Sequence, residues 1–310
     1  MTIETVRWAH STCPHDCPST CALEVEVLDS KTIGRVRGRK GHAYTDGVIC
    51  GKVSRYADRV NHPQRLMHPL KRVGPKGVGM ESFTPISWEQ ALDETAAAFK
   101  GTAQEFGSES VWPYFYAGTM GHVQRDGIER LRHEMRYSGQ HSTFCVTLAD
   151  AGWNAGTGRK RGTAGREIAD CELLVVWGGN PVNTQINVML KFQQARRSRN
   201  AKLVVIDPYC TDTADKADLF LNLRPGTDGA LACAVMHVLF EEDYADWDYL
   251  ERFTDCPTEL REHLKSRDPQ WASERTGIPV SQILEFARLY GSTRQAFIRI
   301  GYGFTRSRNG

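Results

Sequence analysis

The chain has 310 residues, of which 40% are hydrophobic and 25% are charged, and its formal net charge is +2. This composition is typical of a globular protein large enough for two domains, and the small net charge argues against nucleic acid or a membrane surface as a partner. No apolar run approaches the roughly 18 residues of a membrane-spanning helix. Residues 1–10 contain neither an apolar run nor a twin arginine, so we expect no export signal and a cytoplasmic, reducing location.

The first chemical feature of the chain is a series of cysteines: Cys13, Cys17, Cys21 and, much later, Cys50. Four soft thiolates suit zinc or an iron–sulfur cluster. Zinc sites usually take their ligands as two C-x2-C pairs, whereas three closely spaced cysteines and a distant fourth are common around cubane clusters. We therefore predict a [4Fe–4S] cluster, with structural zinc as the alternative. A disulfide framework is disfavoured, because such scaffolds are short, secreted and dense in cysteine.

Two short strands are expected directly after the third cysteine. Residues 22–28 alternate apolar and acidic side chains, and residues 32–38 form a second β run after a turn. The cysteine loop should therefore open a small antiparallel sheet. Lys52, two residues after Cys50, is either a solvated surface lysine or a cation held beside an anionic cluster or cofactor.

Residues 61–79 are rich in proline, glycine and basic side chains, which is typical of an arm that links domains. A helix is predicted to begin after Ser87, whose spacing to Gln90 is that of a capping box. Five side chains at helical spacing predict one buried stripe on this helix: Trp88, Leu92, Thr95, Phe99 and Phe106.

A further strand is predicted at residues 111–116, although Pro113 interrupts it, and residues 118–121 should form a loop at its carboxyl end. Loops in that place bind ligands in α/β sheets. Cys145 follows further along the chain. Its side chain is either a small buried group or a thiolate presented to a metal or substrate.

The second half of the chain has the pattern of a parallel α/β sheet. Four apolar runs predict buried strands: residues 173–177, 203–206, 219–223 and 297–300. Helical stretches follow at residues 181–199 and 230–240, which gives the strand–helix–strand order of a right-handed crossover. A helix should follow the last strand, yet the sequence stops at residue 310, so we expect it to be part of a longer protein.

The loops after these strands carry candidate ligand-binding residues. Gly178 and Gly179 allow a phosphate to approach the backbone before a helix, although the lack of a G-x-G-x-x-G motif disfavours an ordinary nicotinamide or flavin site. Asp207 can accept hydrogen bonds from a ribose. Asp228 either caps the helix that follows or binds a purine edge. Together, on successive loops at one sheet edge, they predict a cofactor that contains a nucleotide.

These motifs resemble the catalytic subunit of the molybdopterin (dimethyl sulfoxide reductase-type) oxidoreductases over essentially the whole chain. The resemblance rests on residues 13–21 (CPHDCPSTC), 49–52 (ICGK), 69–74 (PLKRVG), 86–92 (ISWEQAL), 179–181 (GNP), 207–208 (DP) and 225–229 (PGTDG). It implies an α/β fold in three parts: a small β-rich iron–sulfur domain at residues 1–60, a partial α/β pterin-binding domain at 61–138, and a Rossmann-like α/β domain with a parallel sheet at 139–310. The family's C-terminal β-barrel would lie beyond this sequence.

The resemblance also implies cofactors and residue roles. The four N-terminal cysteines would hold a [4Fe–4S] cluster, and Lys52 would lie between this cluster and the pterin for electron transfer. Molybdenum or tungsten would be held by bis(molybdopterin guanine dinucleotide), with Cys145 as its protein ligand. The remaining cofactor contacts would come from Gly179, Asn180, Asp207, Gly226 and Asp228.

The function that this resemblance implies is an oxidoreductase that couples two-electron chemistry at the metal to electron transfer through the cluster. Its partners would be a small-molecule substrate and an electron-transfer subunit or redox carrier, with no nucleic acid and no membrane insertion. Two alternatives stay open: a tungsten-dependent hydratase without net redox chemistry, and a cofactor-binding or electron-transfer module that is inactive by itself.

Overall fold

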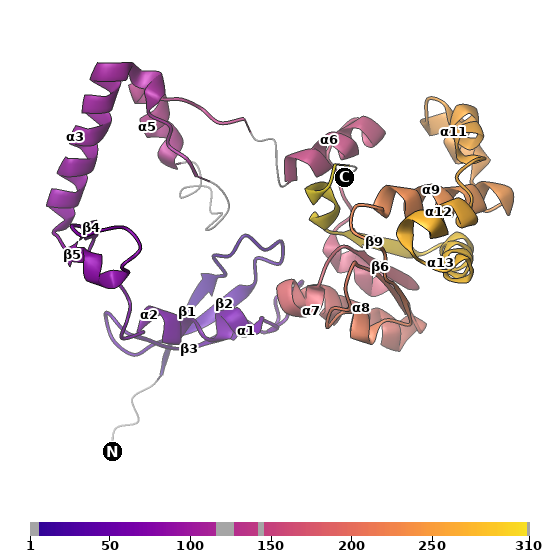
Figure 1. Cartoon of the computed structure of the whole chain (residues 1–310). Helices are drawn as coiled ribbons and strands as arrows, with labels where there is room; N and C mark the ends of the chain where they lie inside the picture. Colours follow the sequence, from indigo (N-terminus) through magenta and orange to yellow (C-terminus); the bar gives the residue numbers. More distant parts are fainter. Residues whose placement is uncertain (1–5, 116–126, 142–145, 309–310) are drawn as a thin grey trace. The chain divides into compact units, whose positions relative to one another are not determined.

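The computed structural model describes residues 6–115, 127–141 and 146–308 (Figure 1). The chain forms two compact units, Met1–His141 and Ser142–Gly310. The finer division into three domains stays a prediction. Among the described residues, no helix is both long enough and apolar enough to cross a membrane.

A three-stranded antiparallel sheet begins the first unit, in the order β1 (Arg7–Thr12), β2 (Ala22–Val27) and β3 (Ile33–Gly38). β2 and β3 confirm the two strands expected from the alternating pattern, and β1 is a third that was not predicted. Leu23 of β2 and Val36 of β3 are buried in one small core. The period of two therefore decides which side chains of the sheet face that core.

Opposite charges on β2 and β3 stabilise the rest of this sheet. Glu24 accepts a hydrogen bond from Arg37 Nε at 2.8 Å, and Glu26 accepts one from Arg35 Nε at 3.1 Å. The Arg37 guanidinium also lies 3.9 Å from the centre of the Trp8 ring on β1. Cross-strand pairs of this kind each stabilise a sheet by about 0.2–1 kcal/mol.

Short elements connect the sheet to one long helix. In chain order the next elements are α1 (Gly51–Ser54), α2 (Tyr56–Val60), β4 (Leu70–Arg72), β5 (Phe83–Pro85), α3 (Trp88–Phe106) and α5 (Gly127–Met135). β4 and β5 pair in antiparallel fashion. α3 begins as predicted, because the Ser87 hydroxyl accepts a hydrogen bond from the Gln90 amide at 3.1 Å. The Gln90 side chain donates to Glu94 at 2.9 Å, so the Ser87 half of the predicted capping box is the half that forms.

The predicted burial of the apolar stripe on α3 is wrong for the described structure. No residue of α3 is buried there, and Trp88, Leu92 and Phe106 are 65%, 63% and 68% exposed. Phe99 has an edge-on contact with Tyr137, with 6.0 Å between the ring centres. Helical periodicity identifies the apolar face of a helix. Burial of that face depends on segments that are distant in the sequence.

The strand predicted at residues 111–116 is also wrong for the part that is described. Residues 111–115 have no regular secondary structure. Val111 is buried, and its carbonyl accepts a hydrogen bond from the Ser138 amide at 3.0 Å. Pro113 has no amide hydrogen for a strand ladder, which disfavours pairing here. Residue 116 and the predicted loop at 118–121 lie outside the described residues.

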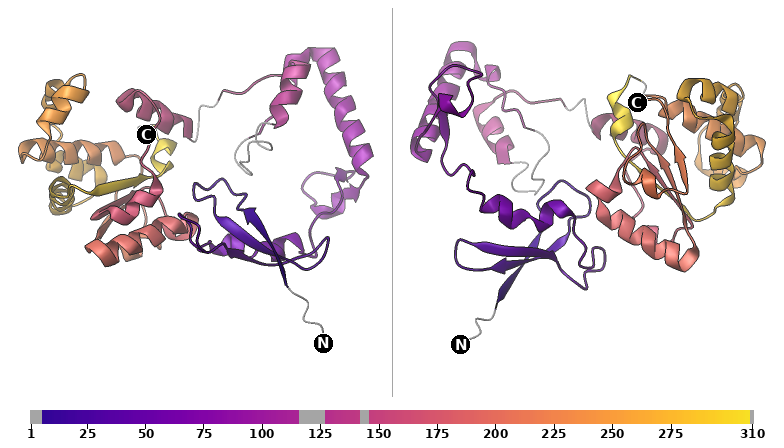
Figure 2. Two further views of the ribbon diagram at one scale, coloured as in Figure 1. Left: turned by 180° about the vertical axis from the view of Figure 1, so that it is seen from behind. Right: turned by 60° about the horizontal axis from the view of Figure 1, so that its bottom comes forward.

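The second unit is built on a four-stranded parallel sheet in the order β8-β7-β6-β9 (Figures 1 and 2). Its strands are β6 (Leu173–Trp177), β7 (Lys202–Ile206), β8 (Leu219–Leu221) and β9 (Ala296–Ile300). All four confirm the predicted apolar runs. β6 is the central strand here, since it pairs along its whole length with β7 on one side and β9 on the other.

Helices cover both faces of this sheet (Figure 2). The helices described in this unit are α6 (Val146–Thr157), α7 (Pro181–Thr184), α8 (Ile186–Arg199), α9 (Asp228–Glu241), α10 (Trp247–Phe253), α11 (Pro257–Leu264), α12 (Pro269–Thr276) and α13 (Val280–Ser292). Leu173 and Val175 of β6 pack with α9, α12 and α13, whereas Leu174 and Val176 pack with α8 on the opposite face. The helix predicted at 181–199 is divided in two at Gln185.

Candidate functional site

Three of the predicted cluster cysteines lie in the loop between β1 and β2. Cys13 directly follows β1 and Cys21 directly precedes β2, and the Cys13 amide donates to the Cys21 carbonyl at 2.9 Å. Sheet pairing therefore continues into the loop and holds these two residues side by side. Cys17 begins a turn that the Thr20 amide closes on the Cys17 carbonyl at 3.1 Å. The fourth residue, Cys50, immediately precedes α1.

The four thiols share one environment. Cys13 and Cys21 are buried in the small core of the first unit, and Cys50 packs against that core. Burial raises the pKa of the Cys13 thiol, and the His15 backbone amide partly offsets this rise. The charges of Cys50 and Cys17 raise the pKa of Cys13 further, so both lie within electrostatic range of it. None of the four is in a disulfide bond.

This donor set fits a cubane cluster better than a single zinc ion. Within the described ranges, no three His, Cys, Asp or Glu side chains converge closely enough to hold one metal ion. In a [4Fe–4S] cluster each iron takes one thiolate, so the ligands surround a body of several atoms and do not meet at one point. Cys13, Cys21 and Cys50 share one core and Cys17 lies within electrostatic range of Cys13, an arrangement that suits the separate thiolates of such a cluster.

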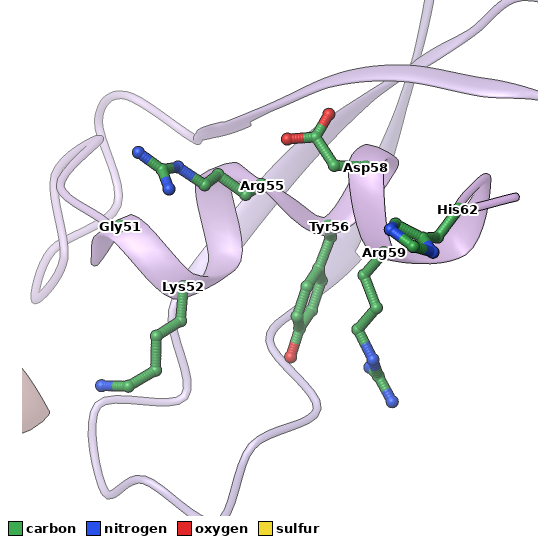
Figure 3. Close-up of a pocket in the computed structure, with 7 residues that line it drawn as sticks. All are labelled: Gly51, Lys52, Arg55, Tyr56, Asp58, Arg59 and His62. Atoms are coloured by element: carbon green, nitrogen blue, oxygen red, sulfur yellow. The ribbon is translucent and has the colours of Figure 1, made fainter. Parts of the chain in front are cut away.

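Lys52 lies in α1, two residues after Cys50, and helps to form a pocket of about 520 Å³ (Figure 3). The pocket is lined by Gly51, Lys52, Arg55, Tyr56, Asp58, Arg59 and His62. Lys52, Tyr56 and Arg59 project from one side of the two short helices, whereas Arg55 and Asp58 project from the other (Figure 3). Basic side chains outnumber the single acidic one, so the pocket favours an anionic group.

In the second unit, the carboxyl end of β6 is the switch point of the parallel sheet, because the strand order runs outward from β6 through β7 to β8 on one side and then returns to β9 on the other. Ligands bind preferentially at such points. Gly178 follows β6 with a φ of +66°, which suits glycine. Gly301 follows β9, donates its amide to the Trp177 carbonyl at 2.7 Å, and approaches Gly178 so closely that a side chain at residue 301 would collide with the Gly178 carbonyl. Two glycines without side chains, Gly178 and Gly301, therefore lie together at this end of the sheet.

The two predicted cofactor-binding glycines have different surroundings. A Cβ added at Gly179 would meet only the Val176 side chain, at 3.8 Å, so the described chain leaves space beside this backbone. Gly226 has a φ of +77°, and a Cβ there would lie 3.0 Å from that of Ser307. The loop that leaves β9 thus packs beside the turn that precedes α9.

Asn180, the N-cap of α7, is oriented by the neighbouring loop. Its Oδ1 accepts a hydrogen bond from the Thr213 hydroxyl at 2.7 Å, and the same hydroxyl oxygen accepts one from the Val182 amide at 3.2 Å. Thr213 is fully buried. The loop after β7 therefore fixes a side chain of the loop after β6, a role for Thr213 that the sequence pattern did not indicate.

The two predicted carboxylates lie within electrostatic range of each other. Asp207 follows β7, is 6% exposed, and accepts a hydrogen bond from the Tyr209 amide at 3.2 Å. Burial is the main cause that raises the pKa of Asp207; the Tyr209 amide partly offsets it, and the charge of Asp228 adds to it. Asp228 accepts a hydrogen bond from the Trp177 indole at 2.8 Å.

The explanation of Asp228 as a helix cap is wrong. α9 begins at Asp228 itself, Thr227 occupies the N-cap position, and the Asp228 carboxylate is directed to Trp177 at the end of β6. Trp177 was not predicted as a site residue. An indole that ends an otherwise aliphatic strand is a usable signal, because a partly buried indole usually finds a hydrogen-bond acceptor. Cys145, the predicted protein ligand to the metal, lies outside the described residues.

Comparison with known families decides which cofactors this arrangement suits. Residues 65–310 match the model of the molybdopterin oxidoreductase family, and residues 6–62 match the model of the molybdopterin oxidoreductase Fe4S4 domain. The chain belongs to the molybdopterin oxidoreductase family. The resemblance seen in the sequence motifs is thereby confirmed, and the Fe4S4 match contains all four N-terminal cysteines. The family supports a [4Fe–4S] cluster and a molybdopterin that holds molybdenum or tungsten.

Curated relatives and a solved structure agree with this assignment. The probable oxidoreductase YoaE of Bacillus subtilis (strain 168) is 38% identical over 301 residues, which are 97% of this chain and 44% of the relative. The dimethyl sulfoxide reductase DmsA of Escherichia coli (strain K12) is 30% identical over 349 residues, 99% of this chain and 42% of the relative. Molybdopterin oxidoreductases such as these are thus more than twice as long as this chain.

Among solved structures, acetylene hydratase from Pelobacter acetylenicus is similar, with a TM-score of 0.78 and 26% sequence identity. The similarity covers 96% of this chain and 40% of that one. The fold is therefore shared between this chain and a structure whose title names a hydratase, which bears on the choice between reaction types.

Proposed function

We propose that this chain supplies the cluster and part of the cofactor site of an oxidoreductase that acts on a small-molecule substrate. A molybdopterin that holds molybdenum or tungsten supplies the two-electron chemistry when bound. Cys13, Cys17, Cys21 and Cys50 would hold the cluster, which would supply single-electron transfer to an electron-transfer subunit or redox carrier. The observation that carries the proposal is that Cys13, Cys21 and Cys50 gather in one core of the matched Fe4S4 domain, with Cys17 within electrostatic range of Cys13.

Lys52 is proposed to lie between the cluster and the pterin. Two properties support this role: it follows Cys50 by two residues, and it projects on the same side as Arg59 into a pocket rich in cations (Figure 3). A cation in this place stabilises negative charge that arrives on either side of it.

We further propose that the pterin is in its guanine dinucleotide form, bound as a pair. Asp207 accepts hydrogen bonds from ribose hydroxyls, and Asp228 accepts them from the guanine edge with the oxygen that does not bind Trp177. Gly179 and Asn180 receive phosphate oxygens on backbone and side-chain donors, and Gly226 allows the turn that places Asp228. Cys145 is proposed as the protein ligand to the metal.

The test is to purify the protein anaerobically and measure its iron, molybdenum, tungsten and pterin contents together with its electron paramagnetic resonance spectrum. The expected result is a cubane signal after reduction and a pterin that releases GMP on acid hydrolysis. A colourless protein without iron would contradict the cluster, and a pterin without guanine would contradict the dinucleotide.

The hydratase is a second candidate function, and the similarity to a solved acetylene hydratase favours it. The two reactions differ in their need for an electron acceptor. Turnover that stops when the acceptor is left out supports the oxidoreductase, whereas turnover that continues without it supports the hydratase. A protein that binds pterin and lacks turnover with either assay would fit a cofactor-binding module.

A further inference from the structure

Tyr56 is the first residue of α2 and lies beside the cysteine centre. Its side chain packs against the buried core that contains Cys13 and Cys21. Burial raises the pKa of the Tyr56 hydroxyl, and the charge of Cys13 raises it further; Arg59 lowers it, and Cys50 again raises it. Two predicted ligands, from two distant segments, therefore act on this one phenol.

The ring of Tyr56 also contacts the ligand loop. Its centre lies 5.5 Å from that of the His15 ring, at a tilt of 45°. His15 stands between Cys13 and Cys17 in the sequence, so the pair bridges the β1–β2 loop and α2. The Arg59 guanidinium also lies 5.8 Å from the Tyr56 ring centre. The ring thus contacts both the ligand loop and a cation of its own helix.

We propose that Tyr56 is a positioning residue that, together with His15, closes one side of the cysteine centre against water and thereby lowers the reduction potential of the cluster and slows its loss in air. This inference rests on the proposed cluster. Each added electron makes an already anionic cluster more negative, and water stabilises the more highly charged form more strongly. A ring that excludes water therefore disfavours reduction, and it also hinders the approach of dissolved oxygen.

The test uses the anaerobically purified chain and three variants: Tyr56→Ala, Tyr56→Phe and His15→Ala. Tyr56→Ala and His15→Ala should both shift the midpoint potential of the cluster to more positive values, measured by a redox titration followed by electron paramagnetic resonance. Both should also lose their visible absorbance in air several-fold faster than the wild type. Tyr56→Phe keeps the ring and should retain the wild-type values, which separates the ring from the hydroxyl.

Tyr249→Ala is the matched control, because Tyr249 is 56% exposed and its ring contacts Phe253 in the second unit. It should leave both measurements unchanged. If Tyr56→Ala does not retain iron, His15→Ala decides: a shifted potential supports the proposal and an unchanged one overturns it. Unchanged potentials in both alanine variants overturn it as well. A wild-type chain without any iron contradicts the proposed function itself, and that outcome is distinct from a normal cluster that Tyr56 does not affect.

Discussion

At the scale of single residues, several candidate functional side chains interact with a residue from a second, distant segment of the chain. Trp177 directs Asp228 and Thr213 directs Asn180 through hydrogen bonds, and the charge of Cys50 raises the pKa of Cys13. Groups from another segment thus fix Asp228 and Asn180, and act on Cys13 through charge alone. Such cross-loop support keeps a polar site in place before its ligand binds.

Cys17→Ala should remove the cluster. The variant leaves three of the four thiolates, so one iron loses its protein ligand. We expect the signal of the reduced cluster to disappear and the iron content to fall. Cys256→Ala is the control, because Cys256 is a free, exposed cysteine in the second unit. A normal spectrum for Cys17→Ala would count against the cluster assignment.

Asp207→Asn should stabilise the cofactor-free protein at neutral pH and weaken its hold on the cofactor. The pKa of Asp207 is raised in the folded state, mainly by burial. Between its ordinary and its raised pKa the folded state binds more protons than the unfolded state, so the free energy of unfolding falls as the pH rises through that window. Asparagine does not titrate, so the free energy of unfolding of the variant does not fall for this reason.

The measurement is the thermal unfolding midpoint of both proteins between about pH 3 and pH 7, with pterin content measured on separate preparations. The two midpoints should converge at the acid end, where Asp207 is protonated. Asp255→Asn serves as the control, since Asp255 is exposed. Equal midpoints at neutral pH would show that burial of the ionised Asp207 carboxylate does not destabilise the folded protein.

At the scale of elements, local sequence signals determine where helices and strands start and end, and tertiary packing determines which of their faces become buried. α3 begins where the Ser87 hydroxyl meets the Gln90 amide. β6 is buried on both faces because its alternate residues meet α8 on one side and α9, α12 and α13 on the other. A single strand therefore connects two hydrophobic cores, and the candidate ligand-binding loop that follows it starts from a rigid position.

Ser87→Ala should destabilise the first unit by about 1 kcal/mol, the usual cost of a lost N-cap. The reason is that the Gln90 amide would lose its acceptor at the start of α3. Chemical denaturation followed by circular dichroism measures the change. Ser87→Asp should restore the stability, since its carboxylate also accepts from the amide and suits the positive end of the helix dipole. A loss of equal size in both variants would show that the cap is not the cause.

At the scale of the whole molecule, the two units differ in how completely they bury their apolar side chains. The second unit has two continuous cores, one on each face of its sheet. In the first unit α3 has large exposed apolar residues, including Trp88, Leu92 and Phe106. Exposed apolar surface of this kind lowers solubility, because it favours association over contact with water.

Leu92→Lys should therefore raise the solubility of the 310-residue chain without loss of helix content. Leu92 is 63% exposed, and lysine is nearly as good a helix former as leucine. Light scattering and size-exclusion chromatography measure the association, and circular dichroism measures the helix. Val175→Lys is the opposing case, since Val175 is fully buried and the charge should unfold the second unit. A chain that stays equally associated after Leu92→Lys would show that α3 is not the cause.

The sequence by itself determined the features that depend on short-range spacing. These are the cysteine series, the alternation in β2 and β3, the Ser87 cap, and the four apolar runs that became the parallel sheet. Apart from the distant Cys50, each is fixed by residues only a few positions apart, so a pattern along the chain is sufficient to predict it. The motifs around the cysteines, Asp207 and Asp228 were specific enough to indicate the family.

Only the tertiary structure decided the contacts between distant segments. It joined Trp177 to Asp228 across 51 positions, brought the backbone of Gly301 against Gly178, and left the stripe of α3 exposed within the described chain. Periodicity tells which side of a helix or strand is apolar, but it carries no information on what will cover that side. The sequence left Asp228 either to cap its own helix or to bind a purine edge, and the packing of β6 beside α9 directed its carboxylate to the Trp177 indole.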